Sequence, residues 1–407
     1  MNGDSREAVA LHVQFALYAT GFLGNGAAKM MSLIVPLWAI SLEPSPFLIG
    51  VILGSRSFLP MLLSIHSGSL MDRWGARRLI IAFAALGLML TPLFPLMPWI
   101  GALIALQMLA GFAETTIWTG AQTFVGQMGR GDTRITGRLV FGSRIGQLSG
   151  PPIAGLAWDF AGPWGAFGVI ALWAAALLGA AWMLPEKQTP TAGRHQPTSF
   201  TLRDLIPRFS DYRDAFKLLA APAIALLIGL SMLNLSVGAV HGSFYVIYVQ
   251  GIGYSATLIG ILVSTASILA AAGTLAAAPL TRTFSEVWVL HLTTAMPIVF
   301  MGLTPFLGTY SLLLVAIAFL GFAQGINQPL IISVISRVTG RQDQGKAVGL
   351  RATNNRITTT FIPIAMGGIV EIIGLGLSFP VICGTLVAIQ ALLLFLNGRL
   401  RREGQIR

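Results

Sequence analysis

Cysteine, acidic side chains and charge in general are scarce in this chain. Its 407 residues include one cysteine, Cys383, and only 15 aspartates and glutamates. A single cysteine excludes a disulfide framework and a cysteine-ligated metal site. Charged residues make up 10% of the sequence, against about 25% in ordinary soluble domains. Because 55% of the residues are hydrophobic and the mean hydropathy is +0.76, the composition excludes a soluble enzyme, a disordered chain and a coiled coil.

Motifs that would indicate catalysis are also missing from the sequence. It has no P-loop lysine motif, no histidine and cysteine cluster for a metal, and no nucleophile elbow. We therefore expect neither an enzyme nor an ATP-driven pump, and no bound cofactor or metal. The first apolar run is too long for a cleavable signal peptide, so we expect that run to be part of the membrane domain.

Long apolar runs dominate what is present. A transmembrane helix needs roughly 20 mainly apolar residues, whereas β-barrel strands are shorter and alternate in polarity. The pattern predicts an all-α membrane protein with twelve transmembrane helices. The predicted spans are about 12–40, 46–69, 79–97, 99–124, 138–160, 163–184, 218–249, 255–280, 287–306, 310–335, 348–372 and 375–397.

Basic residues are distributed unevenly between the two sides of these spans. The chain has 26 lysines and arginines and a net charge of +11. Most lie at the termini and in the loops that follow even-numbered spans, whereas the opposite loops hold acids such as Glu43, Asp159 and Glu371. By the positive-inside rule both termini are cytoplasmic, and we expect a protein of the cytoplasmic (inner) membrane. The positive charge therefore reflects topology and does not predict nucleic-acid binding.

The two halves of the chain resemble each other. The triplet Leu-Ile-Gly at 48–50 recurs at 258–260, and Gly-Phe-Ala-Glu at 111–114 recurs as Gly-Phe-Ala-Gln at 321–324. Arg144, Pro151 and Gly155 recur as Arg356, Pro363 and Gly367. Parallel repeats of this kind are one of the architectures of transporters. We predict two pseudo-symmetric six-helix bundles, at 1–185 and 218–407, joined by a cytoplasmic linker at 186–217.

The loop after the second span carries a recognisable motif. It reads GSLMDRWGARR from Gly68 to Arg78, and it resembles the signature of the major facilitator superfamily. The resemblance covers the whole chain through the twelve spans and the six-plus-six repeat. It implies alternating access and a gating role for the loop, although a basic loop that only fixes topology stays an alternative. The gating residues it implies are Gly68, Asp72, Arg73, Gly75, Arg77 and Arg78.

Small residues recur along the fifth span. They resemble the motif that proton-coupled exporters of this family carry, with Ala154 in place of one glycine. Plain helix packing explains the same pattern, because small residues let helices approach closely. Gln107 stands where the family's drug exporters commonly have an arginine linked to proton coupling. The residues we assign to helix packing are Gly142, Gly146, Gly150, Pro151 and Gly155.

Ionisable residues inside a membrane are costly and normally face a cavity or a partner. Four basic residues, Lys29, Arg56, Arg144 and Arg356, fall well inside the spans, but only one carboxylate, Glu114, does. We expect a Lys29–Glu114 ion pair in which Glu114 takes up the coupling proton, or else a static pair. Arg56 is expected to contact an anion in the cavity or to form a structural pair. Arg144 and Arg356 are expected to clamp an anion or to close an inner gate.

Further polar and aromatic residues lie on helices that, by the resemblance, line the central cavity. His241 contacts substrate, senses pH or is simply a hydrogen-bonded histidine. Trp118 and Tyr245 stack on an organic substrate or only pack. Gln324 belongs to a polar stripe on the tenth span.

The excess of positive charge within the membrane favours an anionic substrate. We therefore predict a monomeric, proton-coupled secondary transporter of a small or medium organic anion that works by alternating access. Its partners are that small molecule, protons and the lipid bilayer. The alternative is a multidrug proton antiporter that exports amphipathic compounds, which the fifth-span motif favours and Gln107 does not.

Overall fold

The computed structural model of the protein describes residues 11–128, 133–186, 219, 221–338 and 344–402. Within these helices the side chains of residues 64–69, 72, 73, 127, 128, 133, 336, 344–348 and 400–402 are not described. Residues 187–218, almost all of the predicted linker, lie outside the described residues. Every regular element in the described part of the chain is a helix.

The first half of the chain forms seven helical elements. They are α1 (Leu11–Ile40), α2 (Pro46–Ser55), α3 (Phe58–Trp74), α4 (Ala76–Leu90), α5 (Leu93–Leu96), α6 (Ile100–Met128) and α7 (Thr133–Trp182). The second half repeats the pattern. Its elements are α9 (Pro222–His241), α10 (Phe244–Gly251), α11 (Ala256–Thr283), α12 (Glu286–Leu303), the short 3-10 helix η3 (Thr304–Phe306), α13 (Tyr310–Val338), α14 (Gln344–Ile373) and α15 (Leu375–Arg402).

Twelve spans follow from these elements. Eleven helical segments are long and apolar enough to cross a membrane, and one of them, Arg134–Trp182, has 49 residues. That segment is bent where Ala161 and Gly162 leave the helical conformation, which is where the sequence predicts the turn between the fifth and sixth spans. The predicted all-α membrane fold is therefore confirmed.

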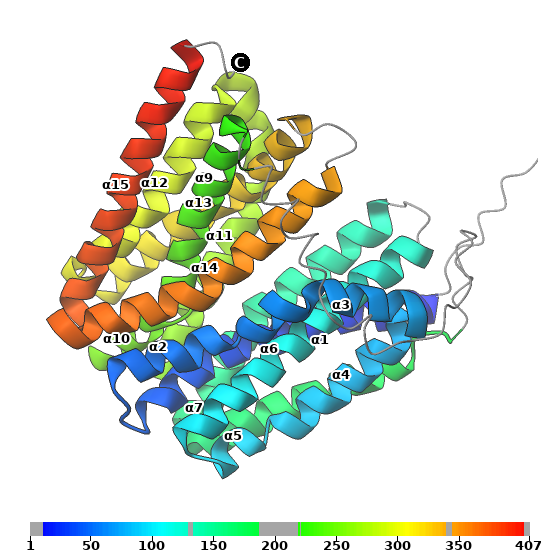
Figure 1. Cartoon of the computed structure of the whole chain (residues 1–407). Coiled ribbons are helices and arrows are strands. Elements are labelled where there is room, and N and C mark those ends of the chain that lie inside the picture. The colour runs from blue at the N-terminus through cyan, green and yellow to red at the C-terminus, as the bar shows by residue number, and fades with distance from the viewer. Residues whose placement is uncertain (1–10, 129–132, 187–218, 220, 339–343, 403–407) are drawn as a thin grey trace, which may run out of the picture.

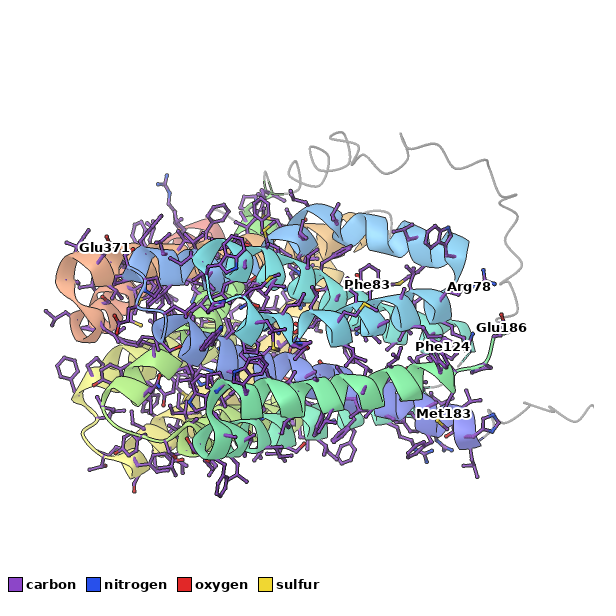
Figure 2. The ribbon with its side chains drawn as sticks, turned by 90° about the horizontal axis from the view of Figure 1, so that it is seen from below. Arg78, Phe83, Phe124, Met183, Glu186 and Glu371 are labelled. Carbon is purple, nitrogen blue, oxygen red and sulfur yellow. The ribbon has the colours of Figure 1, made fainter. Side chains whose placement is uncertain are left out.

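The described helices group into two bundles that meet at one end. Figure 1 shows the ribbons of the two bundles meeting near α2 and α10 and diverging toward the two ends of the chain. We call the end with the 41–45 and 252–255 loops the closed end, and the opposite one the open end. Figure 2 shows Glu371 at the closed end, far from Arg78 and Glu186 at the open end.

The repeated triplet forms part of the contact between the bundles. Ser45 and Ser255 cap the first turns of α2 and α11, each accepting a hydrogen bond at 3.4 Å from the leucine of the triplet, Leu48 or Leu258. Gly50 lies against the backbone of α14, and Gly260 lies against α7. A side chain at either position would overlap a proline carbonyl of the other bundle, which explains why glycine recurs there.

Two carboxylates close this end in matching positions. Asp159, near the end of the fifth span, accepts hydrogen bonds from the backbone N–H groups of Ala256 and Thr257, both at 2.9 Å. Glu371, at the equivalent place in α14, accepts one from the N–H of Phe47 at 3.2 Å. Each acid thus caps the N-terminus of a helix in the opposite bundle, where unpaired N–H groups and the helix dipole favour negative charge.

Removing both caps should loosen the closed end. The double variant Asp159→Ala, Glu371→Ala leaves backbone donors at two helix N-termini without their acceptors, and losing one cap costs about 0.5–2 kcal/mol. We expect the distance between spin labels at Met97→Cys and Gly308→Cys, in a Cys383→Ser background, to become longer and more broadly distributed in pulsed electron resonance.

Glu43→Ala is the matched control, because that closed-end carboxylate takes no part in the hydrogen bonds between the described residues of the two bundles. An unchanged distance distribution in the double variant, or an equal change in the control, would contradict the role of the two caps.

Candidate functional site

The second span breaks at the residue that carries its charge. α2 ends at Ser55 and α3 begins at Phe58, so Arg56 lies in the break. Pro60 contributes to it, because proline lacks the N–H that would bond the carbonyl of Arg56 four residues earlier. Gly111 of α6 packs directly on this point, where a side chain would overlap the Arg56 carbonyl oxygen. Because Gly111 and Glu114 are only three residues apart in α6, this contact places Arg56 beside Glu114.

Glu114 forms its ion pair with Arg56. The Nη2 group of Arg56 donates to Oε2 of Glu114 and also to the carbonyl oxygen of Ala28 in α1, the latter at 2.8 Å. The two charged side chains are 21% and 20% exposed. Nη1 of Arg56 is buried and has no hydrogen-bond partner among the described residues. The hydrogen bonds of Arg56 to Glu114 and Ala28 thus both use Nη2, and Nη1 has hydrogen-bonding capacity left over.

The predicted Lys29–Glu114 pair is wrong. The first span contributes the carbonyl of Ala28 to this contact, while the electrostatic neighbours of the next residue, Lys29, are Arg144 and Arg56. The reason is steric. Because Gly111 has no side chain, the break in the second span packs directly on α6, and Arg56 occupies the place beside Glu114.

The fourth basic residue comes from the other bundle. Arg356 of α14 has Arg56 and Glu114 as its electrostatic neighbours. Lys29, Arg56, Arg144 and Arg356 thus form one chain of interacting charges, which we call the cation cluster. Two of its members, Arg56 and Arg356, interact with Glu114. Arg144 also donates to Gln147 within its own helix at 3.4 Å.

The cation cluster lies where the two bundles still touch. Next to Arg56, the Ser57 hydroxyl accepts a hydrogen bond at 2.9 Å from Thr359, three residues beyond Arg356. Beyond the break, the ribbons of α3 and α14 separate toward the open end (Figure 1). The cluster is thus positioned between the bundles, at the boundary between the closed half and the open half of the protein.

The predicted histidine and aromatic residues lie in different environments. His241 has Lys29 as an electrostatic neighbour, and its ring centroid lies 5.1 Å from that of Tyr245. Tyr245 is fully buried in the core of the closed half. Trp118 packs against an apolar cluster of the first bundle that includes Ile117 and Phe124. His241 therefore adjoins the cation cluster, and Tyr245 lies against His241 with a buried hydroxyl that has no partner among the described residues. A substrate contact of Trp118 or Tyr245 stays a prediction.

A second polar region lies in the other bundle. Gln324 donates to the carbonyl of Asn234 at 3.4 Å, and both residues line a cavity of about 180 Å³ between α9, α13 and α14. Arg351 and Asn355 line the same cavity. Arg351 was not among the residues predicted from the sequence. It lies four residues, or about one turn, before Asn355 in α14, so a polar stripe extended by one turn would have included it.

The described part of the gating loop contacts its own bundle. The turn between α3 and α4 is made by Gly75, whose φ of 83° is a conformation that favours glycine. Arg77 donates to the carbonyls of Leu184, at 2.5 Å, and Trp182, at 3.1 Å, at the end of α7.

For the remaining residues of this loop, the described side chains show one weak contact. Arg78 and Glu186 form a weak, exposed ion pair at 4.0 Å (Figure 2). The side chains of Asp72 and Arg73, and the surroundings of Gly68, lie outside the described residues. The gating role of these residues stays a prediction.

The small residues of the fifth span serve helix contacts. Gly142, Gly146 and Gly150 lie against successive backbone carbonyls of α1. Gly155 lies against Ala256 of the opposite bundle, and the carbonyl of Pro151 faces Gly260. The pattern therefore joins the fifth span to two neighbours at once, one in each bundle.

The fold and the twelve spans define a polytopic membrane transporter. The sequence profile of the Major Facilitator Superfamily matches residues 17–245 and 224–406, so the chain belongs to this family and is a secondary transporter, not an enzyme. A search of curated proteins found no significant sequence match.

Solved transporters share the fold at low sequence identity. A nucleoside transporter NupG variant is 14% identical, with a TM-score of 0.80 over 94% of this chain and 99% of that one. A POT family transporter bound to a thioalcohol-conjugated peptide is 13% identical, with a TM-score of 0.78 over 95% and 96%. A bacterial homologue of the lysosomal transporter Spinster is 14% identical, with a TM-score of 0.70 over 96% of each chain.

Breaking the Arg56–Glu114 pair from one side should destabilise the protein. Glu114→Leu strands the Arg56 guanidinium in the protein interior, and we expect the free energy of unfolding in mixed micelles to fall by about 3 kcal/mol, the lower end for buried pairs because both side chains are partly exposed. The double variant Arg56→Met, Glu114→Leu should lose less than the sum of the two single variants. Strictly additive losses would show that the two charges do not interact.

Proposed function

We propose that the protein is a proton-coupled transporter of a small or medium organic anion. The observation that carries this proposal is the cation cluster, in which Arg56 and Arg356 interact with the single carboxylate Glu114, and Lys29 in turn interacts with Arg56 and Arg144. Taking such charges out of water is costly unless opposite charge compensates them. A carboxylate or phosphate of a substrate supplies that compensation, and arginine binds such groups by two parallel hydrogen bonds.

Glu114 is the candidate for the coupling proton. While it is ionised, its carboxylate accepts a hydrogen bond from Nη2 of Arg56. Protonation removes that competing negative charge and makes the cation cluster more positive, so an anion binds better to the protonated protein. By thermodynamic linkage the anion then favours the proton to the same extent. This reciprocal coupling is what co-transport of a proton and an anion requires.

The positive-inside rule gives the orientation. Arg77, Arg78 and both ends of the described chain lie at the open end, so we assign that end and both termini to the cytoplasm and the protein to the inner membrane. The cation cluster then faces inward in this structure. In the alternating-access cycle of a monomer, the loop from Gly68 to Arg78 acts on the inner gate, and the caps formed by Asp159 and Glu371 hold the outer one.

The competing assignment, a multidrug proton antiporter, rests on the small residues of the fifth span. Gly142, Gly146 and Gly150 pack the span on α1, which accounts for them without an export function. The cation cluster also repels lipophilic cations.

A thermal-shift panel of organic anions and lipophilic cations should separate the two assignments. We expect purified protein to be stabilised by at least one anion and by none of the cations. In Lys29→Ala and Arg356→Ala the affinity for that anion should fall by about tenfold or more, because each variant loses a charge-assisted hydrogen bond worth roughly 1.5–3 kcal/mol.

Arg282→Ala is the matched control, because it removes a basic residue at the exposed end of α11. Stabilisation by cations alone, unchanged in the Lys29 and Arg356 variants, would contradict the proposed function.

A further inference from the structure

The two bundles place the same helices together but with different side chains. In the first bundle Gly111 packs on the Arg56 carbonyl, and in the second Gly321 packs on the carbonyl of Ala266. The sequence repeat makes Gly321 the counterpart of Gly111 and Gln324 the counterpart of Glu114. The second bundle therefore keeps the packing of the charged site but carries an amide where the first carries the carboxylate.

The amide is part of a larger neutral surface. The residues that line the cavity of about 180 Å³ between α9, α13 and α14 include Asn234, Gln324 and Asn355. A second cavity, in the first bundle between α1, α4, α6 and the sixth span, measures about 40 Å³ and, apart from Glu114 and Thr91, is lined by apolar residues and glycines. Of these two cavities in the described part of the chain, the one in the second bundle is therefore both the larger and the richer in neutral hydrogen-bonding groups.

Two of these amides have an atom free for a ligand. Nδ2 of Asn234 and Oδ1 of Asn355 are buried and have no hydrogen-bond partner among the described residues. They come from α9 and α14, on different sides of the cavity. A buried polar atom without a partner is unfavourable, so a ligand that supplies both an acceptor and a donor fits this wall better than an apolar one.

The position of the cavity links it to the charged site. Asn355 precedes Arg356 of the cation cluster, so one segment of α14 contributes to both regions. Arg351 lines the cavity one turn nearer to the open end, where its charge favours the entry of anions. A single elongated molecule can therefore reach both regions from the open end.

We propose that this cavity binds the neutral end of the substrate, and that the substrate is an organic anion bearing hydroxyl, carbonyl or amide groups. The inference rests on the proposed anion transport and adds the chemical class of the molecule. Its carboxylate or phosphate lies at the cation cluster, and its hydrogen-bonding groups lie against Asn234, Gln324 and Asn355. A purely apolar tail leaves these amides without partners and binds weakly.

Matched pairs of anions test this proposal on the full-length protein. Each pair has equal charge and similar size and differs in its hydrogen-bonding groups: gluconate with hexanoate, glucuronate with cyclohexanecarboxylate, and ribose 5-phosphate with pentyl phosphate. We expect the polar member of at least one pair to bind at least tenfold more tightly than its apolar match in thermal-shift or calorimetric titrations. The proposal is overturned if no polar member does so.

Variants of the cavity residues then test whether the preference for polar anions arises in this cavity. Asn234→Leu and Asn355→Leu, which keep the side-chain size but remove the hydrogen bonds, should each reduce the tenfold preference to below threefold while leaving the apolar partner's affinity unchanged. Asn397→Leu makes the same change at a buried asparagine of α15 outside the cavity and should keep the preference. A preference that survives both cavity variants overturns the proposed site.

The same titrations separate this inference from the proposed function. If polar and apolar anions bind equally well and Lys29→Ala weakens both, the anion site stands and the amide cavity is not part of it. If no anion binds, or if Lys29→Ala changes nothing, the proposed function itself fails. Unfolding temperatures of the unliganded variants, measured in parallel, show that each variant is folded.

Discussion

The Arg56–Glu114 ion pair is the interaction on which the arrangement of the site depends. It exists because the second span breaks at Arg56 and because Gly111 lets α6 pack on the break. With Glu114 engaged, the charges of Lys29, Arg144 and Arg356 are left without a carboxylate of their own among the described residues. In the proposed mechanism, the protonation of this single carboxylate therefore decides how strongly this part of the protein attracts an anion.

The internal repeat explains how the same fold supports both a gate and an asymmetric site. At the closed end the two halves keep matching chemistry: Ser45 and Ser255 cap helices, Gly50 and Gly260 allow close approach, and acids from each bundle cap the other. At mid-depth the packing is kept, but the side chains differ between the halves. Symmetric gating surfaces with an asymmetric centre are what an alternating-access protein needs to bind an asymmetric molecule.

Much of the fold could be predicted from hydrophobic runs alone, since twelve apolar segments with a six-plus-six repeat allow few arrangements. The gap at 161–162 was placed correctly even though the helix continues across it as one bent element. The sequence also identified the residues of the cation cluster, because a charge inside an apolar run is conspicuous.

The pairing inside the site could not be predicted in the same way. Lys29 and Glu114 lie at similar depths, but depth does not say which helix contacts which. The answer depended on Gly111, whose missing side chain lets the second span pack against α6 beside Glu114. Arg351 was missed for a related reason, because it lies close to a helix end where basic residues are ordinarily topological.

The proposal that Glu114 takes up a proton when an anion binds can be tested by measuring proton uptake during binding. The measurement is made on purified protein in weakly buffered solution, with the anion that gives the largest thermal stabilisation. We expect the wild-type protein to take up protons when the anion binds. The Glu114→Gln variant should still bind the anion but without this proton uptake. Binding without proton uptake in the wild type, or equal uptake in Glu114→Gln, would contradict the role assigned to Glu114.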